Sequence, residues 1–180
     1  IAFAIGPAAG QAAGMLNQMI TANGLQFHVA TAGAPSMPML LFLHGFPEYS
    51  GAWAELFERL SDTYFCVAPD QRGYGQSSKP DGVAAYATGK LAADAAAILT
   101  HFSPAAHAVI GHDWGASVAY ALAMRAASQI DRLVMVGGSS LLSSLEAALC
   151  QLCPNAQIEN HNAMTAVADG LALSAAGAFA

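Results

Sequence analysis

Short apolar runs that alternate with helical segments constrain the fold of this chain more than any other feature. Each run has the length of a strand and is apolar nearly throughout, which is typical of a strand buried on both faces. Such strands separated by helices predict an α/β fold, with a mostly parallel sheet covered by helices on both faces. The runs are MLLFL (39–43), TYFCVA (63–68), AHAVIG (106–111) and DRLVMVG (131–137), and a short strand, LQFHVAT (25–31), precedes them. Helices are expected from about Ser50, over 83–102 and over 114–128.

The pattern divides the chain into three parts. Residues 1–23 are rich in Ala and Gly without a clean period, so we expect a loosely ordered lead-in there. Residues 24–140 carry the alternating pattern and form the core of the domain. Residues 141–180 carry a weaker pattern, with a helix expected over 141–152, a strand over 155–159 and a final Ala-rich helix. We expect this end to be a degenerate or shortened part of the same domain.

Length and charge exclude several classes of protein. The chain has 180 residues, 55% of them hydrophobic, with six basic and twelve acidic side chains. This length fits one domain with a sizeable core, and six cations are too few for a nucleic-acid-binding surface. No run of about 18 apolar residues indicates a membrane span. The start lacks the cationic region of a secretory signal, so we expect a cytoplasmic protein. A chain that begins at Ile1 in place of Met is typical of a fragment.

The three cysteines do not form a disulfide framework. Cys66 lies in an apolar run, where a free cysteine behaves as a small hydrophobe. Cys150 and Cys153 form a C-x-x-C pair, but a zinc site needs two further ligands and a redox site needs a thioredoxin-like context. Because neither is visible in the sequence, we expect no metal and no cofactor.

The hexapeptide GHDWGA (111–116) lies between an apolar run and the following helix. It has the small-x-nucleophile-x-small spacing of a nucleophile elbow, with Asp113 at the nucleophile position. Gly111 and Gly115 would let the strand and helix backbones pass closely at such a turn. The turn would present Asp113 at the carboxyl end of the strand, where open α/β sheets bind ligands. Taken alone, the Asp is explained equally well as the cap of a helix that begins at Trp114.

Two further motifs follow apolar runs: HGFPE (44–48) and DQRGYGQSSKP (70–80). Together with GHDWG they resemble the α/β-hydrolase superfamily, and specifically its epoxide hydrolase branch. The three motifs stand in that family's order, each at the end of the matching strand, and the resemblance covers about residues 24–137. Relatives carry a cap domain after the fourth strand, and the chain is too short to hold one, so we expect the cap to be missing. Glu48 is expected to close a loop salt bridge.

An aspartate nucleophile restricts the substrate. A carboxylate is already ionised at pH 7, since its ordinary pKa is about 3.9, and at an sp³ carbon with a leaving group it forms an ester. A small apolar epoxide or alkyl halide is therefore the expected partner. Water activated by a base must then hydrolyse the ester, with an oxyanion hole for the intermediate. The resemblance implies that the backbone N–H groups of Phe46 and Trp114 form this hole. His44, Gly45 and Pro47 would support the loop that carries it.

The resemblance identifies only some of the remaining catalytic groups in this sequence. His161 is the only histidine C-terminal to the fourth strand, where relatives carry their catalytic His. It is the candidate base, and the alternative is an ordinary loop histidine. Relatives place the triad acid after the fourth strand or the next one, but the fourth strand runs into GGSSLLSS without a carboxylate, so no acid is assigned. Relatives also supply two cap tyrosines as acids, and none of the five tyrosines lies where a cap would follow.

Three functions are compatible with this sequence. The first is a hydrolase of the epoxide hydrolase type, which opens an epoxide through an ester on Asp113 that water then attacks. The second is a catalytically incomplete remnant that binds ligands or partners, including a homodimer formed through the uncapped apolar face. The third is a haloalkane dehalogenase-like enzyme in which the Trp114 indole receives the halide. The HGFPE motif favours the epoxide branch.

Overall fold

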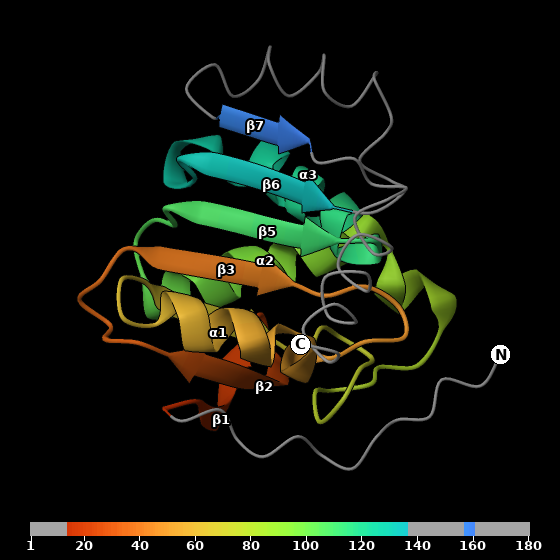
Figure 1. Cartoon of the computed structure of the whole chain (residues 1–180). Helices are drawn as coiled ribbons and strands as arrows, with labels where there is room; N and C mark the ends of the chain where they lie inside the picture. Colours follow the sequence, from red (N-terminus) through yellow and green to blue (C-terminus); the bar gives the residue numbers. More distant parts are fainter. Residues whose placement is uncertain (1–13, 137–156, 161–180) are drawn as a thin grey trace, which may run out of the picture.

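The computed structural model describes residues 14–136 and 157–160, and within them one sheet of seven strands has the order β1-β2-β4-β3-β5-β6-β7 (Figure 1). All neighbouring pairs from β4 to β7 are parallel, whereas β2 is antiparallel to both β1 and β4. The strands are β1 (Leu16–Ala22), β2 (Leu25–Ala32), β3 (Met39–Leu43), β4 (Phe65–Pro69), β5 (Ala108–His112), β6 (Arg132–Val136) and β7 (Gln157–Asn160). The helices are α1 (Ala54–Leu60), α2 (Thr88–Phe102) and α3 (Trp114–Ala126), with 3₁₀ turns at Ser50–Trp53, Val83–Tyr86 and Ala127–Gln129. The predicted mostly parallel α/β sheet is confirmed.

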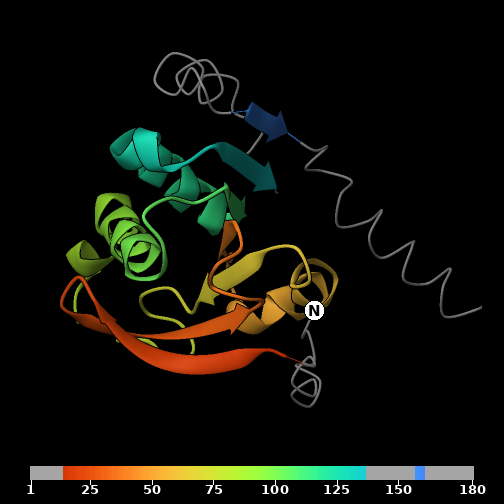
Figure 2. The same cartoon turned by 90° about the vertical axis from the view of Figure 1, so that its left-hand side faces the viewer.

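Helices cover both faces of the sheet, with α1 on one side and α2 and α3 on the other (Figures 1 and 2). On the α1 side, the rings of Trp53 and Phe57 pack against Phe42, with centroids 5.2 and 5.4 Å apart. On the opposite side, Ile98 of α2 and Leu122 of α3 are buried against the strands. Strands β3 and β4 are consequently buried at every position. This explains why they read as continuous apolar runs in the sequence.

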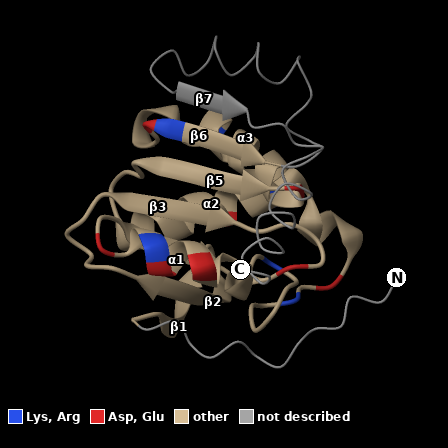
Figure 3. Ribbon diagram, viewed as in Figure 1, with Lys and Arg blue, Asp and Glu red and all other residues tan. Residues whose placement is uncertain are grey.

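Charged side chains are nearly absent from the sheet. Within the described strands, Arg132 and Glu159 are the only Lys, Arg, Asp or Glu residues. The other charged residues of the described part of the chain lie on the helices and loops around the sheet (Figure 3). Cys66 is fully buried in β4, and burial raises the pKa of its thiol to about 11, as expected for an unreactive small hydrophobe. Among the described helices, none has both the length and the apolar composition that crossing a membrane requires.

The loosely ordered lead-in predicted over 1–23 is wrong where β1 forms. This strand pairs antiparallel with β2 through the two-residue turn Asn23-Gly24, in which φ is 47° and 75°. Asn-Gly between two strands is the strongest short-range hairpin signal, because both residues tolerate a positive φ. The apolar pattern could not reveal the strand, since only Ile20 and Ala22 of β1 are buried.

Several of the other predicted elements begin or end at different residues in the structure. The helix expected over 83–102 is interrupted at Ala87, whose extended backbone (φ −58°, ψ 138°) separates the 3₁₀ turn from α2. The strand expected over 155–159 is confirmed as β7, which is parallel to β6. Residues 1–13, 137–156 and 161–180 lie outside the described part, and with them the predicted helix at 141–152, Cys150, Cys153, His161 and the predicted final helix.

Candidate active site

Asp113 lies at a sharp turn between β5 and α3, with φ 51° and ψ −120°. A positive φ is uncommon and strained for a residue other than glycine. The Asp113 N–H donates to the Val136 carbonyl at 2.9 Å, and the Asp113 carbonyl accepts from the Ala116 N–H at 3.0 Å. Although Asp113 precedes α3, its side chain makes no capping hydrogen bond. The geometry therefore agrees with a nucleophile elbow and not with a helix cap.

Two glycines allow the elbow to form. A Cβ on Gly111 would lie 2.5 Å from the Gly115 carbonyl oxygen and 2.7 Å from the Ala116 Cα. A Cβ on Gly115 would collide with the Leu43 carbonyl at the end of β3. The close approach predicted from GHDWGA is thus found at both glycines. It holds the start of α3 against the carboxyl ends of two neighbouring strands.

The loop after β3 lies against the Asp113 carboxylate. The Phe46 N–H donates to Asp113 Oδ2 at 3.2 Å. A Cβ on Gly45 would lie 2.6 Å from the Asp113 Cβ, so a larger residue would push this loop away. Pro47 follows Phe46 through a cis peptide bond, and the Phe46 side chain is exposed. The structure therefore brings the HGFPE and GHDWG motifs together at one edge of the sheet, as their places after parallel strands predicted.

His44 is fully buried and links the loop after β3 to the loop after β4. Its Nδ1 lies 2.8 Å from the Gly45 carbonyl oxygen, and its Nε2 accepts the Gln71 N–H at 3.0 Å. Because Nε2 accepts this bond, the hydrogen of the neutral ring is assigned to Nδ1, which donates to Gly45. Burial lowers the pKa of His44 and favours this neutral form. These hydrogen bonds are the contacts through which His44 would support the loop after β3, as the sequence suggested.

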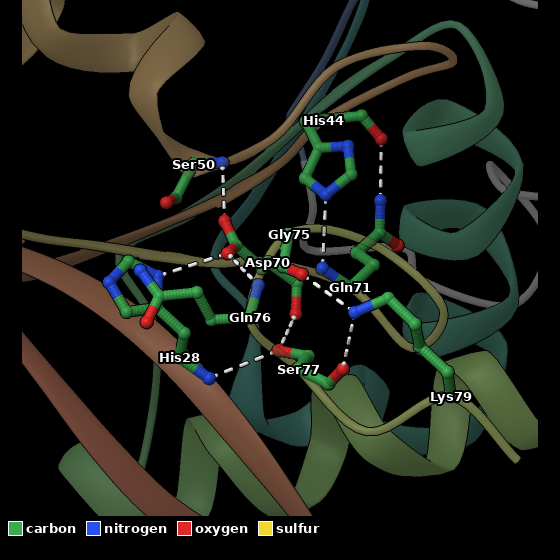
Figure 4. A network of polar contacts seen from close by, with 9 residues as sticks. All are labelled: His28, His44, Ser50, Asp70, Gln71, Gly75, Gln76, Ser77 and Lys79. Atoms are coloured by element: carbon green, nitrogen blue, oxygen red, sulfur yellow. Dashed lines mark hydrogen bonds and ion pairs between the residues drawn. The ribbon is translucent and has the colours of Figure 1, made fainter. Parts of the chain in front are cut away.

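The loop that begins with DQRGYG is held by the buried carboxylate of Asp70 (Figure 4). Asp70 Oδ1 accepts the Ser50 N–H at 2.9 Å, and Oδ2 accepts the Gln76 N–H at 3.0 Å. His28 Nδ1 lies 3.1 Å from the same Oδ2. Burial acts to raise the pKa of Asp70, but the hydrogen bonds and the nearby His28 outweigh it and lower the pKa. The ionised carboxylate thus fixes the loop beside His44.

Glu48 and His112 form an ion pair next to Asp113. Glu48 Oε2 lies 3.0 Å from His112 Nδ1 and accepts the Gly45 N–H at 2.9 Å. The hydrogen bond to Glu48 raises the pKa of His112, and the same bond lowers the pKa of Glu48. The predicted salt bridge of Glu48 is confirmed, but the sequence did not identify its partner. The partners are 64 positions apart, and only the meeting of the two motifs brings them together.

This pair is expected to stabilise the fold most between about pH 4.5 and pH 6.5. The pKa of Glu48 is lowered from 4.5, so its contribution is complete above that pH and is lost as the pH falls through the lowered pKa. The pKa of His112 is raised from 6.5, so its contribution is complete below that pH and is lost as the pH rises through the raised pKa. Because both side chains are partly exposed, we expect at most about 1 kcal/mol.

The measurement is the free energy of urea unfolding of the wild type and of Glu48→Gln across the acidic and neutral pH range. The difference between the two proteins should be largest inside the window and should shrink on both sides. Glu58→Gln, on the exposed surface of α1, removes the same charge and should show no such maximum. A difference that is flat with pH would contradict the prediction.

The structure places the other predicted site residues as follows. Trp114 begins α3 directly after Asp113, and its side chain is 61% exposed. His161 lies outside the described residues, so its role as the base stays a prediction. Among the described residues, no three His, Cys, Asp or Glu side chains gather in a way that could hold a metal ion. The described site thus consists of a carboxylate, its N–H donor and the loops that hold them.

Comparison with known proteins supports the same family. A family model described as "alpha/beta hydrolase fold" matches residues 38–161. An AB hydrolase superfamily protein of Bacillus subtilis is 39% identical over 124 residues, which cover 68% of this chain and 43% of that protein. Epoxide hydrolase A of Mycobacterium tuberculosis is 38% identical over 104 residues, which cover 57% of this chain and 32% of that protein. The chain therefore spans less than half the length of these curated relatives.

Solved structures give the same result. An epoxide hydrolase from Vigna radiata superposes with a TM-score of 0.66 and 32% identity, over 69% of this chain and 40% of that one. Epoxide hydrolase A from Mycobacterium thermoresistibile also has a TM-score of 0.66 and 32% identity, over 77% of this chain and 45% of that one. The family model, the sequence relatives and the structural neighbours agree on one fold family. The chain therefore belongs to the α/β-hydrolase fold family, in which it is epoxide hydrolase-like.

Proposed function

We propose that the chain is a hydrolase of the epoxide hydrolase type that attacks its substrate through Asp113. One observation carries the proposal: Asp113 stands at a strained elbow with its Oδ2 on the Phe46 N–H, 3.2 Å away. A carboxylate in this position is a nucleophile that needs no base. Relatives that bear the name epoxide hydrolase support the epoxide as the electrophile.

The reaction would proceed in two steps. In the first, an Asp113 carboxylate oxygen bonds to an epoxide carbon, the ring C–O bond breaks, and the ring oxygen takes a proton from solvent water to become a hydroxyl group; the base returns a proton to the solvent after the second step. In the second, water adds to the carbonyl carbon of the ester and loses a proton to a base, and the tetrahedral intermediate then releases a diol and the carboxylate. The net reaction adds one water to the epoxide.

The Phe46 N–H has a role in the second step. If the ester forms through the other carboxylate oxygen, Oδ2 remains the carbonyl oxygen of that ester and stays beside the N–H. Oδ2 then carries the negative charge when water adds, and a donor already aimed at it stabilises that charge without reorganisation. The Trp114 N–H is proposed as the second donor, and His161 as the base. A cytoplasmic location and a small apolar substrate complete the proposal.

Intact mass spectrometry after incubation with styrene oxide tests this proposal. We expect either a covalent adduct, if the ester accumulates, or the diol by chromatography, if water completes the cycle. Peptide mapping of protein quenched in acid should place any ester on the peptide that contains Asp113. The peptide with Asp131, whose side chain is 70% exposed, serves as the matched control and should be unmodified.

The outcomes separate the competing functions. Neither adduct nor diol would refute the epoxide hydrolase proposal and favour a non-catalytic binding or dimerising domain. An ester formed from 1-bromobutane but not from styrene oxide would favour a dehalogenase-like reaction. In that reaction the indole N–H of the exposed Trp114 would donate a hydrogen bond to the leaving halide.

A further inference from the structure

A pocket of about 200 Å³ lies directly beside the elbow. Its wall includes Tyr74 of the loop after β4, Tyr86 of the 3₁₀ turn, Leu91 of α2, and Trp114 and Val118 of α3. Trp114 follows Asp113 in the chain, so the pocket and the nucleophile share a wall. Burial, and after it the charge of Asp113, raises the pKa of Tyr74.

The surface that this pocket offers to a ligand is mainly aromatic and aliphatic. Two polar side chains in its wall, Gln71 and Arg72, are already hydrogen-bonded within the protein. The Gln71 amide donates to the His44 carbonyl, and the Arg72 guanidinium donates to both Asp94 oxygens and to the Ala85 carbonyl. The rest of the wall is made of ring faces and methyl groups together with the hydroxyl groups of Tyr74 and Tyr86 and the indole N–H of Trp114, and this mainly apolar surface favours an apolar ligand group.

The edge of the pocket near Asp113 is rigid. The ring of Tyr74 meets His44 edge-on, with centroids 4.9 Å apart and an interplanar angle of 79°. His44 is itself held by its hydrogen bonds to Gly45 and Gln71. A pocket wall fixed in this way needs little rearrangement to accept a flat ring, so less conformational entropy is lost on binding.

The volume is sufficient for one aromatic ring. An apolar cavity of about 150 Å³ is known to bind benzene, and the present pocket is larger, at about 200 Å³. We propose that this pocket, between Tyr74, Tyr86, Leu91 and Trp114, binds the aryl substituent of the substrate, so that the substrate class is a mono-aryl epoxide. This inference rests on the proposed function, because it assumes that the reacting epoxide lies at Asp113.

Binding of the diol product tests the pocket without requiring any chemistry. The chain has two tryptophans, and Trp53 is buried on the α1 side of the sheet whereas Trp114 lines the pocket. Titration with 1-phenylethane-1,2-diol should change the Trp114 emission with saturation, and Trp114→Phe should remove that change. Propane-1,2-diol, which carries the same diol and no ring, should give no saturable change.

Substitution at Leu91 tests the location. Leu91→Phe, which fills the pocket, should weaken binding of the phenyl diol at least tenfold. Leu56→Phe is the matched control, because Leu56 is partly exposed on α1, on the other side of the sheet, and it should bind within twofold of wild type. Circular dichroism shows whether each variant is folded. If Leu91→Phe fails to fold, Leu91→Ala provides the test and should increase the affinity for a naphthyl diol relative to wild type.

Failure of this inference can be told apart from failure of the proposed function. Saturable binding that Leu91→Phe weakens supports the pocket even if no ester or diol is ever formed from styrene oxide. An ester on Asp113 together with no saturable binding of the phenyl diol, or with equal effects of Leu91→Phe and Leu56→Phe, would overturn the pocket assignment and leave the hydrolase proposal standing.

Discussion

An Asp113→Asn variant is expected to form no ester with styrene oxide and to lose at least about 10³-fold in any diol-forming activity. The amide is nearly the same size as the carboxylate and its oxygen can still accept the Phe46 N–H bond, so the elbow should keep its shape. The change removes the negative charge that makes the side chain a nucleophile. Loss of activity with an unchanged fold would thus identify the carboxylate itself as the reacting group.

The comparison requires a matched aspartate. The Asp131 side chain is 70% exposed and lies before the start of β6, at the opposite end of the parallel strands from Asp113, so Asp131→Asn should retain full activity. Single-turnover mass spectrometry and diol chromatography measure the two variants side by side. Adduct formation by Asp113→Asn at the wild-type rate would show that another group attacks the epoxide, and the mechanism proposed for Asp113 would be wrong.

Arg72→Met is expected to lower the free energy of unfolding by about 3–5 kcal/mol. Arg72 and Asp94 are nearly fully buried, with 7% and 5% of their side chains exposed, and they form a bidentate pair with both N···O distances at 2.7 Å. Removing the guanidinium leaves the Asp94 charge in the interior without its partner. The hydrogen bond to Asp94 also raises the pKa of Arg72, so the guanidinium keeps its charge at neutral pH.

Urea unfolding followed by tryptophan fluorescence measures this loss. Arg125→Met, at an exposed position on α3, is the control and should change the unfolding free energy by less than about 0.5 kcal/mol. The double variant Arg72→Met/Asp94→Leu should recover most of the loss, because it removes both charges from the interior. Equal effects of Arg72→Met and Arg125→Met would show that the pair does not hold the loop.

Loss of the Arg72–Asp94 pair should also affect the candidate active site, because the pair is connected to it. Arg72 follows Gln71, which hydrogen-bonds to His44, and the same guanidinium reaches the Ala85 carbonyl. Asp94 on α2 also accepts a hydrogen bond from Asn23 in the β1–β2 turn, at 2.7 Å. One buried pair thus connects the turn, the loop after β4 and α2. We expect the loop after β4, which contacts His44, to loosen when the pair is broken.

The sequence predicted local structure better than it predicted contacts between distant segments. The runs at 39–43 and 63–68 predicted strands because burial on both faces leaves no polar position in them. The edge strand β1 was missed because most of its side chains face solvent, although Asn23-Gly24 was there to indicate a hairpin. The residue Asp113 itself was found from its motif spacing, but that spacing is compatible with both an elbow and a helix cap.

The sequence by itself determined the α/β class, the parallel sheet and the residues of the two motifs at its carboxyl edge. Each of these follows from periodicity, turn chemistry or a spacing within a few residues. The tertiary structure decided that Asp113 faces the Phe46 N–H, that Glu48 pairs with His112, and that a pocket opens beside Trp114. These contacts join segments that are far apart in the chain, and their distances depend on how the strands are ordered in the sheet, which no local pattern specifies.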